Sequence, residues 1–222
     1  MKISPAWKPA AVVFDCDGLL VDTETCWAVA ESEIFARYGL PFGPQQKALL
    51  IGKSVAHEAH EIAKAVGASS ARDIEVDLLE LAAQAIRKGA RPMPGAVSLV
   101  ERVGRVLPMA VASNSPRRLV DLALEQGQFG RTFRETVAAD EVGRPKPAPD
   151  LYIEACRRLS VAPGQALAFE DSMTGVLAAQ AAGMKVICIP TLPELEYPAD
   201  AVFDSLGDRR LLGWLTACIP SF

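Results

Sequence analysis

The sequence lacks the long apolar runs of a membrane protein, because no window in its 222 residues approaches the ~20 unbroken apolar residues that a spanning helix needs. Its opening residues, MKISPAWKPA, also lack the apolar stretch of a secretory signal. We therefore expect a cytoplasmic protein that has no membrane partner.

Cysteine and histidine are also scarce. The 5 cysteines are an odd number, scattered with no C-x-x-C pair, so we predict that they are reduced and mostly buried. The 2 histidines, His57 and His60, lack the four-residue spacing of the zinc motif H-E-x-x-H, which places both on one helical face. We interpret them as exposed residues of a helix.

Strong charge of either sign is absent too, because 27 acidic and 23 basic residues give a formal net charge of −4. A mildly acidic surface repels phosphodiester backbones, so we expect no nucleic-acid partner. An anionic substrate would have to be met by a few placed cations. Hydrophobic residues make up 50% of the chain, which is typical of a protein with an ample core. The length suits one domain with an insertion.

Short apolar runs rich in Val, Ile and Phe recur along the chain, and in its later part they alternate with helical periodicity. The predicted strands are residues 11–14, 109–112, 136–138, 166–169, 186–189 and 201–203. Continuous apolar runs indicate strands that are covered on both faces. We therefore predict an α/β fold with a Rossmann-like parallel sheet flanked by helices.

Between the first two predicted strands the pattern is helical, without a convincing strand. We expect three helices there: one after a cap at Asp22 that stops at Gly39, one from Ser54 to Gly67, and one that ends at Gly89. The predicted organisation is a core domain of residues 1–20 and 92–222 with an inserted helical domain of residues 21–91.

The segment Asp15-Cys16-Asp17-Gly18-Leu19-Leu20-Val21-Asp22 directly follows the first predicted strand. In an open parallel sheet, ligands gather beyond the carboxyl ends of the strands. Two acids crowded there repel each other unless a donor or a divalent cation compensates, and Mg²⁺ fits oxygen ligands. Taken alone, this segment is equally well explained as a loop whose aspartates cap the next helix.

Three further strand ends carry polar groups of the kind that phosphate chemistry needs. They are Ser113-Asn114-Ser115-Pro116 before a helix, Lys146 in the proline-stiffened segment 143–150, and Glu170-Asp171-Ser172. Free N–H groups at a helix start suit an anion, and a fixed ammonium can neutralise a phosphoryl oxygen. The four segments together favour a phosphate site over coincidence.

In this order, the four segments resemble the haloacid dehalogenase-like hydrolase superfamily, and the helical insertion resembles the cap of its beta-phosphoglucomutase-like branch. The resemblance implies a Mg²⁺-dependent phosphatase for a small metabolite, most plausibly a sugar or polyol phosphate, that forms an aspartyl-phosphate. Asp15 would be the nucleophile and Asp17 the general acid and base. The remaining implied roles are Mg²⁺ binding by Asp15, the Asp17 backbone carbonyl and Asp171 with support from Glu170, and phosphoryl binding by Ser113, Asn114 and Lys146.

Three alternative functions compete with this interpretation. Dehalogenation is disfavoured, because a halide leaves without a proton and dehalogenases lack an aspartate where Asp17 stands. A phosphosugar mutase would carry a histidine and an arginine in its cap, where alignment on Leu50-Ile51-Gly52-Lys53-Ser54 gives Trp27 and Val55. A non-catalytic phosphometabolite-binding protein would gain nothing from two crowded carboxylates.

Substrate specificity is expected to come from the cap, where Glu24, Trp27 and Lys53 are the candidates. Lys53 is equally well explained as a solvated surface lysine, and Trp27 as a core residue. The expected partner is a small phosphorylated molecule, and we expect a monomer.

Overall fold

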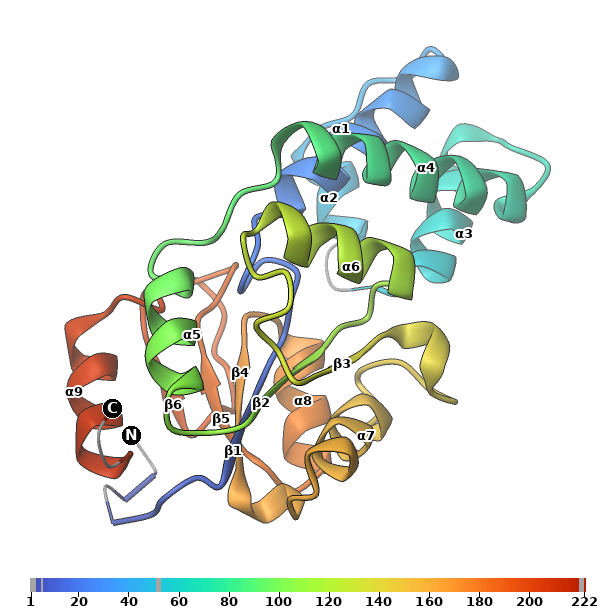
Figure 1. Cartoon of the computed structure of the whole chain (residues 1–222). Coiled ribbons are helices and arrows are strands. Elements are labelled where there is room, and N and C mark those ends of the chain that lie inside the picture. Colours follow the sequence, from blue (N-terminus) through green and yellow to red (C-terminus); the bar gives the residue numbers. More distant parts are fainter. Residues whose placement is uncertain (1–2, 5, 51–52, 220–221) are drawn as a thin grey trace.

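The computed structural model describes residues 3–4, 6–50, 53–219 and 222, and these form an α/β core with a group of helices above one edge of its sheet (Figure 1). The sheet is six-stranded and parallel, in the order β3-β2-β1-β4-β5-β6. Its strands are β1 (Ala11–Phe14), β2 (Met109–Ala112), β3 (Glu135–Val137), β4 (Ala166–Glu170), β5 (Lys185–Cys188) and β6 (Ala201–Val202). The predicted fold class is confirmed.

The register of the central strands brings the polar segments to one edge. Phe14 at the end of β1 pairs with Val111 in β2 and with Phe169 in β4. The ladder continues one residue further, where the Asp15 amide donates to the Phe169 carbonyl at 3.0 Å. Since β1 has β2 on one side and β4 on the other, this edge is the switch point at which such sheets bind ligands.

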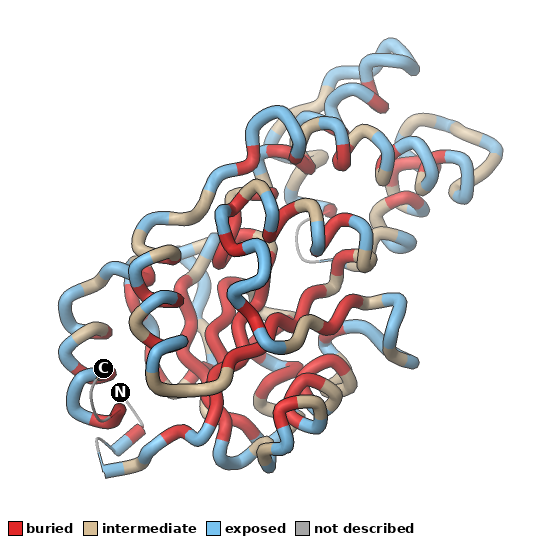
Figure 2. The backbone as a smooth tube through the Cα atoms, viewed as in Figure 1, coloured by how far each residue is buried: buried red, intermediate tan, exposed pale blue. Residues whose placement is uncertain are grey.

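Helices cover both faces of the sheet. They are α5 (Ala96–Gly104), α6 (Arg117–Gln126), α7 (Asp150–Leu159), α8 (Met173–Ala181) and α9 (Arg209–Cys218), with short 3₁₀ turns at Ala139–Glu141 and Pro163–Gln165. Side chains of β1 alternate between the two faces, so Val12 and Phe14 join one apolar cluster and Ala11 and Val13 the other. Burial is therefore concentrated in the strands (Figure 2).

The helical insertion, called the cap below, contains α1 (Glu24–Arg37), α2 (Pro44–Leu50), α3 (Val55–Val66) and α4 (Ala71–Gly89). The three predicted helices correspond to α1, α3 and α4, and Gly67 ends α3 in the left-handed conformation, as expected. The expectation of only three helices is wrong, because α2 lies between them. Only Leu50 of α2 is buried, so its apolar pattern is too weak to predict a helix.

The chain enters and leaves the cap through two adjacent segments. Val21 and Pro92 form an antiparallel bridge, flanked by bonds from the Asp22 amide to the Arg91 carbonyl (2.8 Å) and from the Met93 amide to the Leu20 carbonyl (2.9 Å). This pairing supports the proposed division into residues 1–20 with 92–222 and residues 21–91. Besides these crossings, α4 of the cap packs against α6 of the core.

No helix in the described ranges is both long and apolar enough to cross a membrane. All 5 cysteines are buried and free, as predicted. His57 and His60 are exposed on α3, which agrees with their interpretation as surface residues.

Candidate active site

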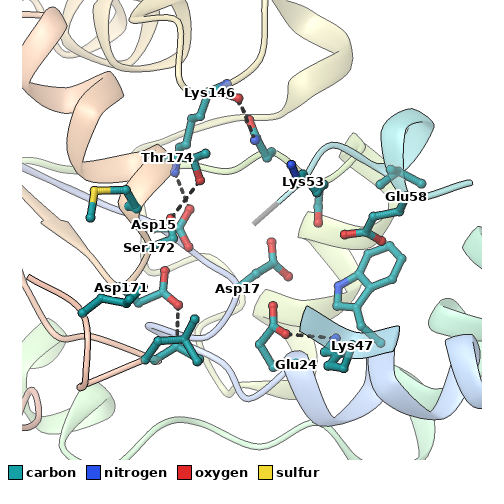
Figure 3. Close-up of a pocket in the computed structure, with 18 of the residues that line it drawn as sticks. Asp15, Asp17, Glu24, Lys47, Lys53, Glu58, Lys146, Asp171, Ser172 and Thr174 are labelled. Atoms are coloured by element: carbon teal, nitrogen blue, oxygen red, sulfur yellow. Dashed lines mark hydrogen bonds and ion pairs between the residues drawn. The ribbon is translucent and has the colours of Figure 1, made fainter. Parts of the chain in front are cut away.

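A cavity of about 280 Å³ lies between the carboxyl edge of the sheet and the cap (Figure 3). Its lining includes most of the residues that the sequence singled out: Asp15, Asp17, Asn114, Lys146 and Asp171 from the core, and Glu24, Trp27 and Lys53 from the cap. Two others, Ser113 and Glu170, are fully buried behind its wall. Residues more than a hundred positions apart thus meet at one site.

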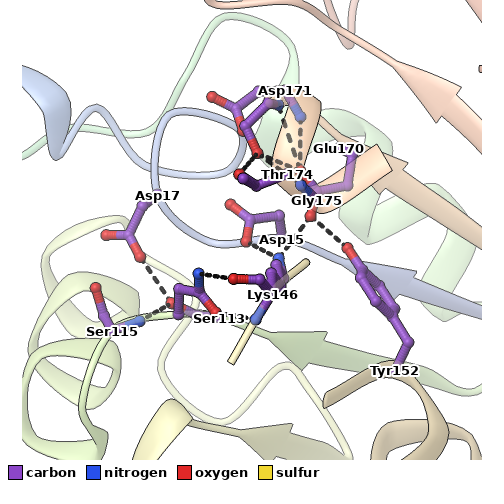
Figure 4. Close-up of polar contacts among 12 residues, drawn as sticks. Asp15, Asp17, Ser113, Ser115, Lys146, Tyr152, Glu170, Asp171, Thr174 and Gly175 are labelled. Atoms are coloured by element: carbon purple, nitrogen blue, oxygen red, sulfur yellow. Dashed lines mark hydrogen bonds and ion pairs between the residues drawn. The ribbon is translucent and has the colours of Figure 1, made fainter. Parts of the chain in front are cut away.

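Lys146 joins two carboxylates at the core end of the cavity. Its Nζ donates to Asp15 Oδ1 and to Glu170 Oε1, each at 2.5 Å (Figure 4). Asn114 holds the Lys146 backbone from both sides, because its Oδ1 accepts from the Lys146 amide at 2.8 Å and its Nδ2 donates to the carbonyl at 3.3 Å. The ammonium is therefore fixed in place before any substrate arrives.

Both oxygens of Glu170 are already engaged. Oε1 also accepts from the hydroxyl of Tyr152 at 2.5 Å, and Oε2 accepts from the Asp171 amide at 3.1 Å and the Ser172 hydroxyl at 3.2 Å. Tyr152 is fully buried on α7, and the sequence analysis did not single it out. These contacts make Glu170 a support for Lys146.

Negative charge exceeds positive charge at this end of the cavity. Oxygens of Asp15, Glu170 and Asp171 lie within 4.8 Å of one another, and Lys146 is the ammonium bonded to two of these carboxylates. Burial raises the pKa of Asp15 although Lys146 lowers it, and burial together with the neighbouring carboxylates raises the pKa of Asp171. A buried cluster with this excess of carboxylate oxygen fits a hard divalent cation such as Mg²⁺.

The Asp17 carboxylate is held between the core and the start of the cap. Oδ1 accepts from the Thr23 hydroxyl and Oδ2 from the Ser113 hydroxyl, each at 2.7 Å. The Ser113 oxygen in turn accepts from the Ser115 amide at 2.9 Å. Ser113 thus orients Asp17 from behind the wall, whereas Ser115 lines the cavity. The predicted phosphoryl contact of Ser113 stays a prediction.

The cap side of the cavity holds charges that the sequence analysis did not single out. Lys47 from α2 bonds to Glu31 at 3.0 Å and to Glu24 at 3.3 Å, and Glu58 from α3 also lines the cavity. Lys47 was missed because α2 was not predicted. Glu58 could have been found, because it stands one turn after Val55 at the edge of the apolar face of α3.

The predicted cap candidates have different surroundings. Trp27 is 7% exposed and belongs to the apolar cluster as well as to the cavity wall, so both of its interpretations apply. Lys53 is exposed at the rim. Its neighbours Ile51 and Gly52 in the expected specificity loop lie outside the described residues.

A fifth strand end completes the site. Thr191 follows β5, and its hydroxyl donates to Asp171 Oδ2. Leu192, Leu195 and Tyr197 from the same segment line the cavity. A hydrogen bond between residues 171 and 191 depends on the pairing of β4 with β5, and no motif in the sequence pointed to Thr191.

Comparisons with known proteins identify the family and the relatives of this chain. The family model described as haloacid dehalogenase-like hydrolase matches residues 12–189. The chain is 32% identical to (DL)-glycerol-3-phosphatase 2 of Arabidopsis thaliana, over 91% of this chain and 90% of the relative. It is 31% identical to the fructose-1-phosphate phosphatase YqaB of Escherichia coli, over 82% of this chain and 97% of the relative.

Two further matches extend the comparison. The bifunctional riboflavin kinase/FMN phosphatase of Arabidopsis thaliana is 31% identical over 92% of this chain, which spans only 55% of that longer protein. Among solved structures, CbbY from Rhodobacter sphaeroides in complex with phosphate superposes with a TM-score of 0.79 at 27% identity, covering 90% of this chain and 96% of CbbY.

Proposed function

Because this chain belongs to the haloacid dehalogenase-like hydrolase family and is a phosphoric monoester hydrolase, we propose that it hydrolyses a small phosphorylated sugar or polyol with the help of Mg²⁺. The observation that carries the proposal is the fixed bridge from Lys146 to Asp15 and Glu170 at the floor of the cavity. The curated relatives that act on glycerol phosphate and fructose 1-phosphate support the substrate class.

The proposed reaction has two steps. The Asp15 carboxylate attacks phosphorus and displaces the alcohol oxygen, which gives an aspartyl-phosphate and splits one difficult substitution into two. Water then attacks the same phosphorus and restores the free carboxylate. Lys146, held by Asn114 and Glu170, neutralises the phosphoryl oxygens and requires no reorganisation during the reaction.

Asp17 moves the protons in both steps. It lies between Asp15 and the cap residues, where it can donate to the departing alcohol and then accept from the attacking water (Figure 3). The hydroxyls of Thr23 and Ser113 hold both carboxylate oxygens, so the side chain is kept in one orientation. Each oxygen accepts one of these bonds and has a second lone pair, so Asp17 can carry a proton without losing either contact.

Mg²⁺ would be held by Asp15, Asp171 and the backbone carbonyl of Asp17. When bound, it supplies positive charge to the transferring phosphoryl group. Glu170 supports this centre through Lys146, because its own oxygens are occupied by Lys146, Tyr152 and the start of α8. We also propose that the protein acts in the cytoplasm as a monomer without a nucleic-acid or membrane partner.

Gly175 leaves the space that the Glu170 carboxyl group occupies, because it has no side chain. A Cβ at Gly175 would lie 1.9 to 2.0 Å from the Glu170 carboxyl group, whereas a Cβ at Gly213 in α9 would meet no atom within 4 Å. We expect Gly175→Ala to displace Glu170 and Lys146 and to lower kcat by about 100-fold. Gly213→Ala should keep kcat and gain about 1 kcal/mol of unfolding free energy. Steady-state kinetics and thermal unfolding measure both, and normal kcat in Gly175→Ala would contradict the assigned role of Glu170.

The function itself is tested by measuring phosphate release from a panel of on the order of a hundred phosphorylated metabolites, with Mg²⁺ and with the Asp15→Asn variant as background. We expect release from sugar or polyol phosphates above that background. Inertness across the panel would favour a non-catalytic binding protein. Formation of glucose 6-phosphate from glucose 1-phosphate, without free phosphate, would favour the mutase.

A further inference from the structure

The cap side of the cavity has acidic walls, and this charge bears on which leaving group the protein accepts. The inference rests on the proposed phosphatase function. Core groups bind the phosphoryl end of a substrate, so the alcohol that leaves must lie on the cap side, beyond Asp17 (Figure 3). The charged groups on this side come from three helices and one loop: Glu24 on α1 with Glu31 behind the lining, Lys47 on α2, Lys53 before α3, and Glu58 on α3.

The charge of the Lys47 ammonium is already matched within the cap, because Lys47 bonds to Glu31 at 3.0 Å and to Glu24 at 3.3 Å. Glu31 is 1% exposed, and its Oε2 is buried without a hydrogen-bond partner among the described residues. Glu24 and Glu31 therefore share the ammonium of Lys47. Two carboxylates with one ammonium leave a net negative charge beneath the cap wall.

Glu58 adds a third carboxyl group on the same side. In the part of the chain that the structure describes it has no ion-pair partner, and it is half-buried in the cavity wall. Burial and the nearby charge of Glu31 raise the pKa of Glu58 to about 9, although Lys47 opposes the shift. The surroundings thus resist a negative charge even on this residue, and they would resist one on a bound ligand in the same way.

Lys53 opposes this effect, because a cation at the rim of the cavity attracts an anionic leaving group. Its side chain is exposed to solvent, where the interaction between charges is roughly four times weaker than in partly buried surroundings. Salt screens it further. The carboxyl groups of Glu24, Glu31 and Glu58 are partly or fully buried, so they outweigh the exposed ammonium of Lys53.

The rest of the cap side suits a leaving group that is uncharged and carries hydroxyls. Trp27 offers an apolar face, and a carboxyl group such as that of Glu58 accepts hydrogen bonds from hydroxyls in either protonation state. We propose that this side of the cavity selects phosphate esters whose leaving group has no second anionic group, with Glu58 contacting its hydroxyls.

The test compares kcat/KM for the best substrate of the panel with that for its analogue in which a hydroxymethyl group is oxidised to a carboxylate or is phosphorylated. Glycerol 3-phosphate with 3-phosphoglycerate, and fructose 1-phosphate with fructose 1,6-bisphosphate, are two such pairs. We expect the wild-type protein to prefer the uncharged member by at least about tenfold, because like charges brought together at a binding site oppose association.

Introduction of a cation at one position completes the test. Glu58→Lys should reduce the preference at least about tenfold or invert it, whereas Glu61→Lys, the same change on α3 but outside the cavity lining, should leave it unchanged. A wild-type preference for the anionic member, or an unchanged ratio in a folded Glu58→Lys protein, would overturn the inference. If no ester is hydrolysed at all, the proposed function fails instead. The wild-type comparison needs no variant, so it decides even if Glu58→Lys does not fold.

Discussion

Replacement of Asp15 by Asn is expected to abolish phosphate release, with a fall in kcat of about four orders of magnitude or more. The amide has the shape of the carboxylate but is neutral and a poor nucleophile, so the aspartyl-phosphate cannot form. The neutral replacement weakens the bond of Asp15 to Lys146 but also relieves its repulsion with two buried carboxylates, and Lys146 keeps Glu170 as its partner. We therefore expect a folded variant that is inactive for chemical reasons.

The measurement is phosphate release under saturating substrate, together with thermal unfolding of the same sample. Asp121→Asn is a matched control, since Asp121 is an exposed acid on α6 whose ion pair with Arg117 lies outside the cavity. The control should keep both the wild-type rate and the wild-type midpoint of unfolding to within a few degrees. A near-normal rate in Asp15→Asn would mean that the bond to phosphorus is not made by this carboxylate.

Removal of divalent metal should have an effect of similar size. Dialysis against EDTA is expected to lower phosphate release by about a thousandfold or more, and added Mg²⁺ should restore it. The physical reason is the excess of buried carboxylates around Asp15, Glu170 and Asp171, which would repel an incoming phosphate dianion.

Metal binding has a readout that is independent of turnover. A cation that binds only the folded protein raises its midpoint of unfolding as the metal concentration rises. We expect this shift with Mg²⁺ in the wild-type protein and a much smaller one in Asp171→Asn, while Asp121→Asn should respond like the wild type. Full activity in EDTA, or a shift unaltered in Asp171→Asn, would contradict the proposed metal site.

Much of the core could be predicted from the sequence, because its strands are buried on both faces and therefore appear as unbroken apolar runs. The bounds of β1 and β2 agree with the prediction residue for residue. β3 and β5 begin one residue earlier than predicted, at Glu135 and Lys185, where a polar first residue hides the start of the strand. α2 was missed because only one of its residues, Leu50, is buried in the apolar core, so its sequence shows no clear apolar pattern.

Some residues of the candidate site could also be predicted from the sequence, and others could not. Asp15, Lys146 and Asp171 could be predicted because each follows a strand or stands in a distinctive loop. Their supporting contacts could not, because the bonds of Tyr152 to Glu170 and of Thr191 to Asp171 exist only after distant segments have packed. The cap charges were also missed, since the pairing of Lys47 with Glu31 depends on how α2 lies against α1.

The adjacent crossings between core and cap have a practical consequence. Since Val21 and Pro92 are bridged to each other, the two connections between the insertion and the rest of the chain lie side by side. A chimera could therefore be spliced at these two neighbouring points without altering the pairing of any sheet strand. Grafting the insertion of a relative, with Thr23 and the residues of α4 that face α6 retained, would transfer substrate choice as one piece and leave the contacts of Asp17 unchanged.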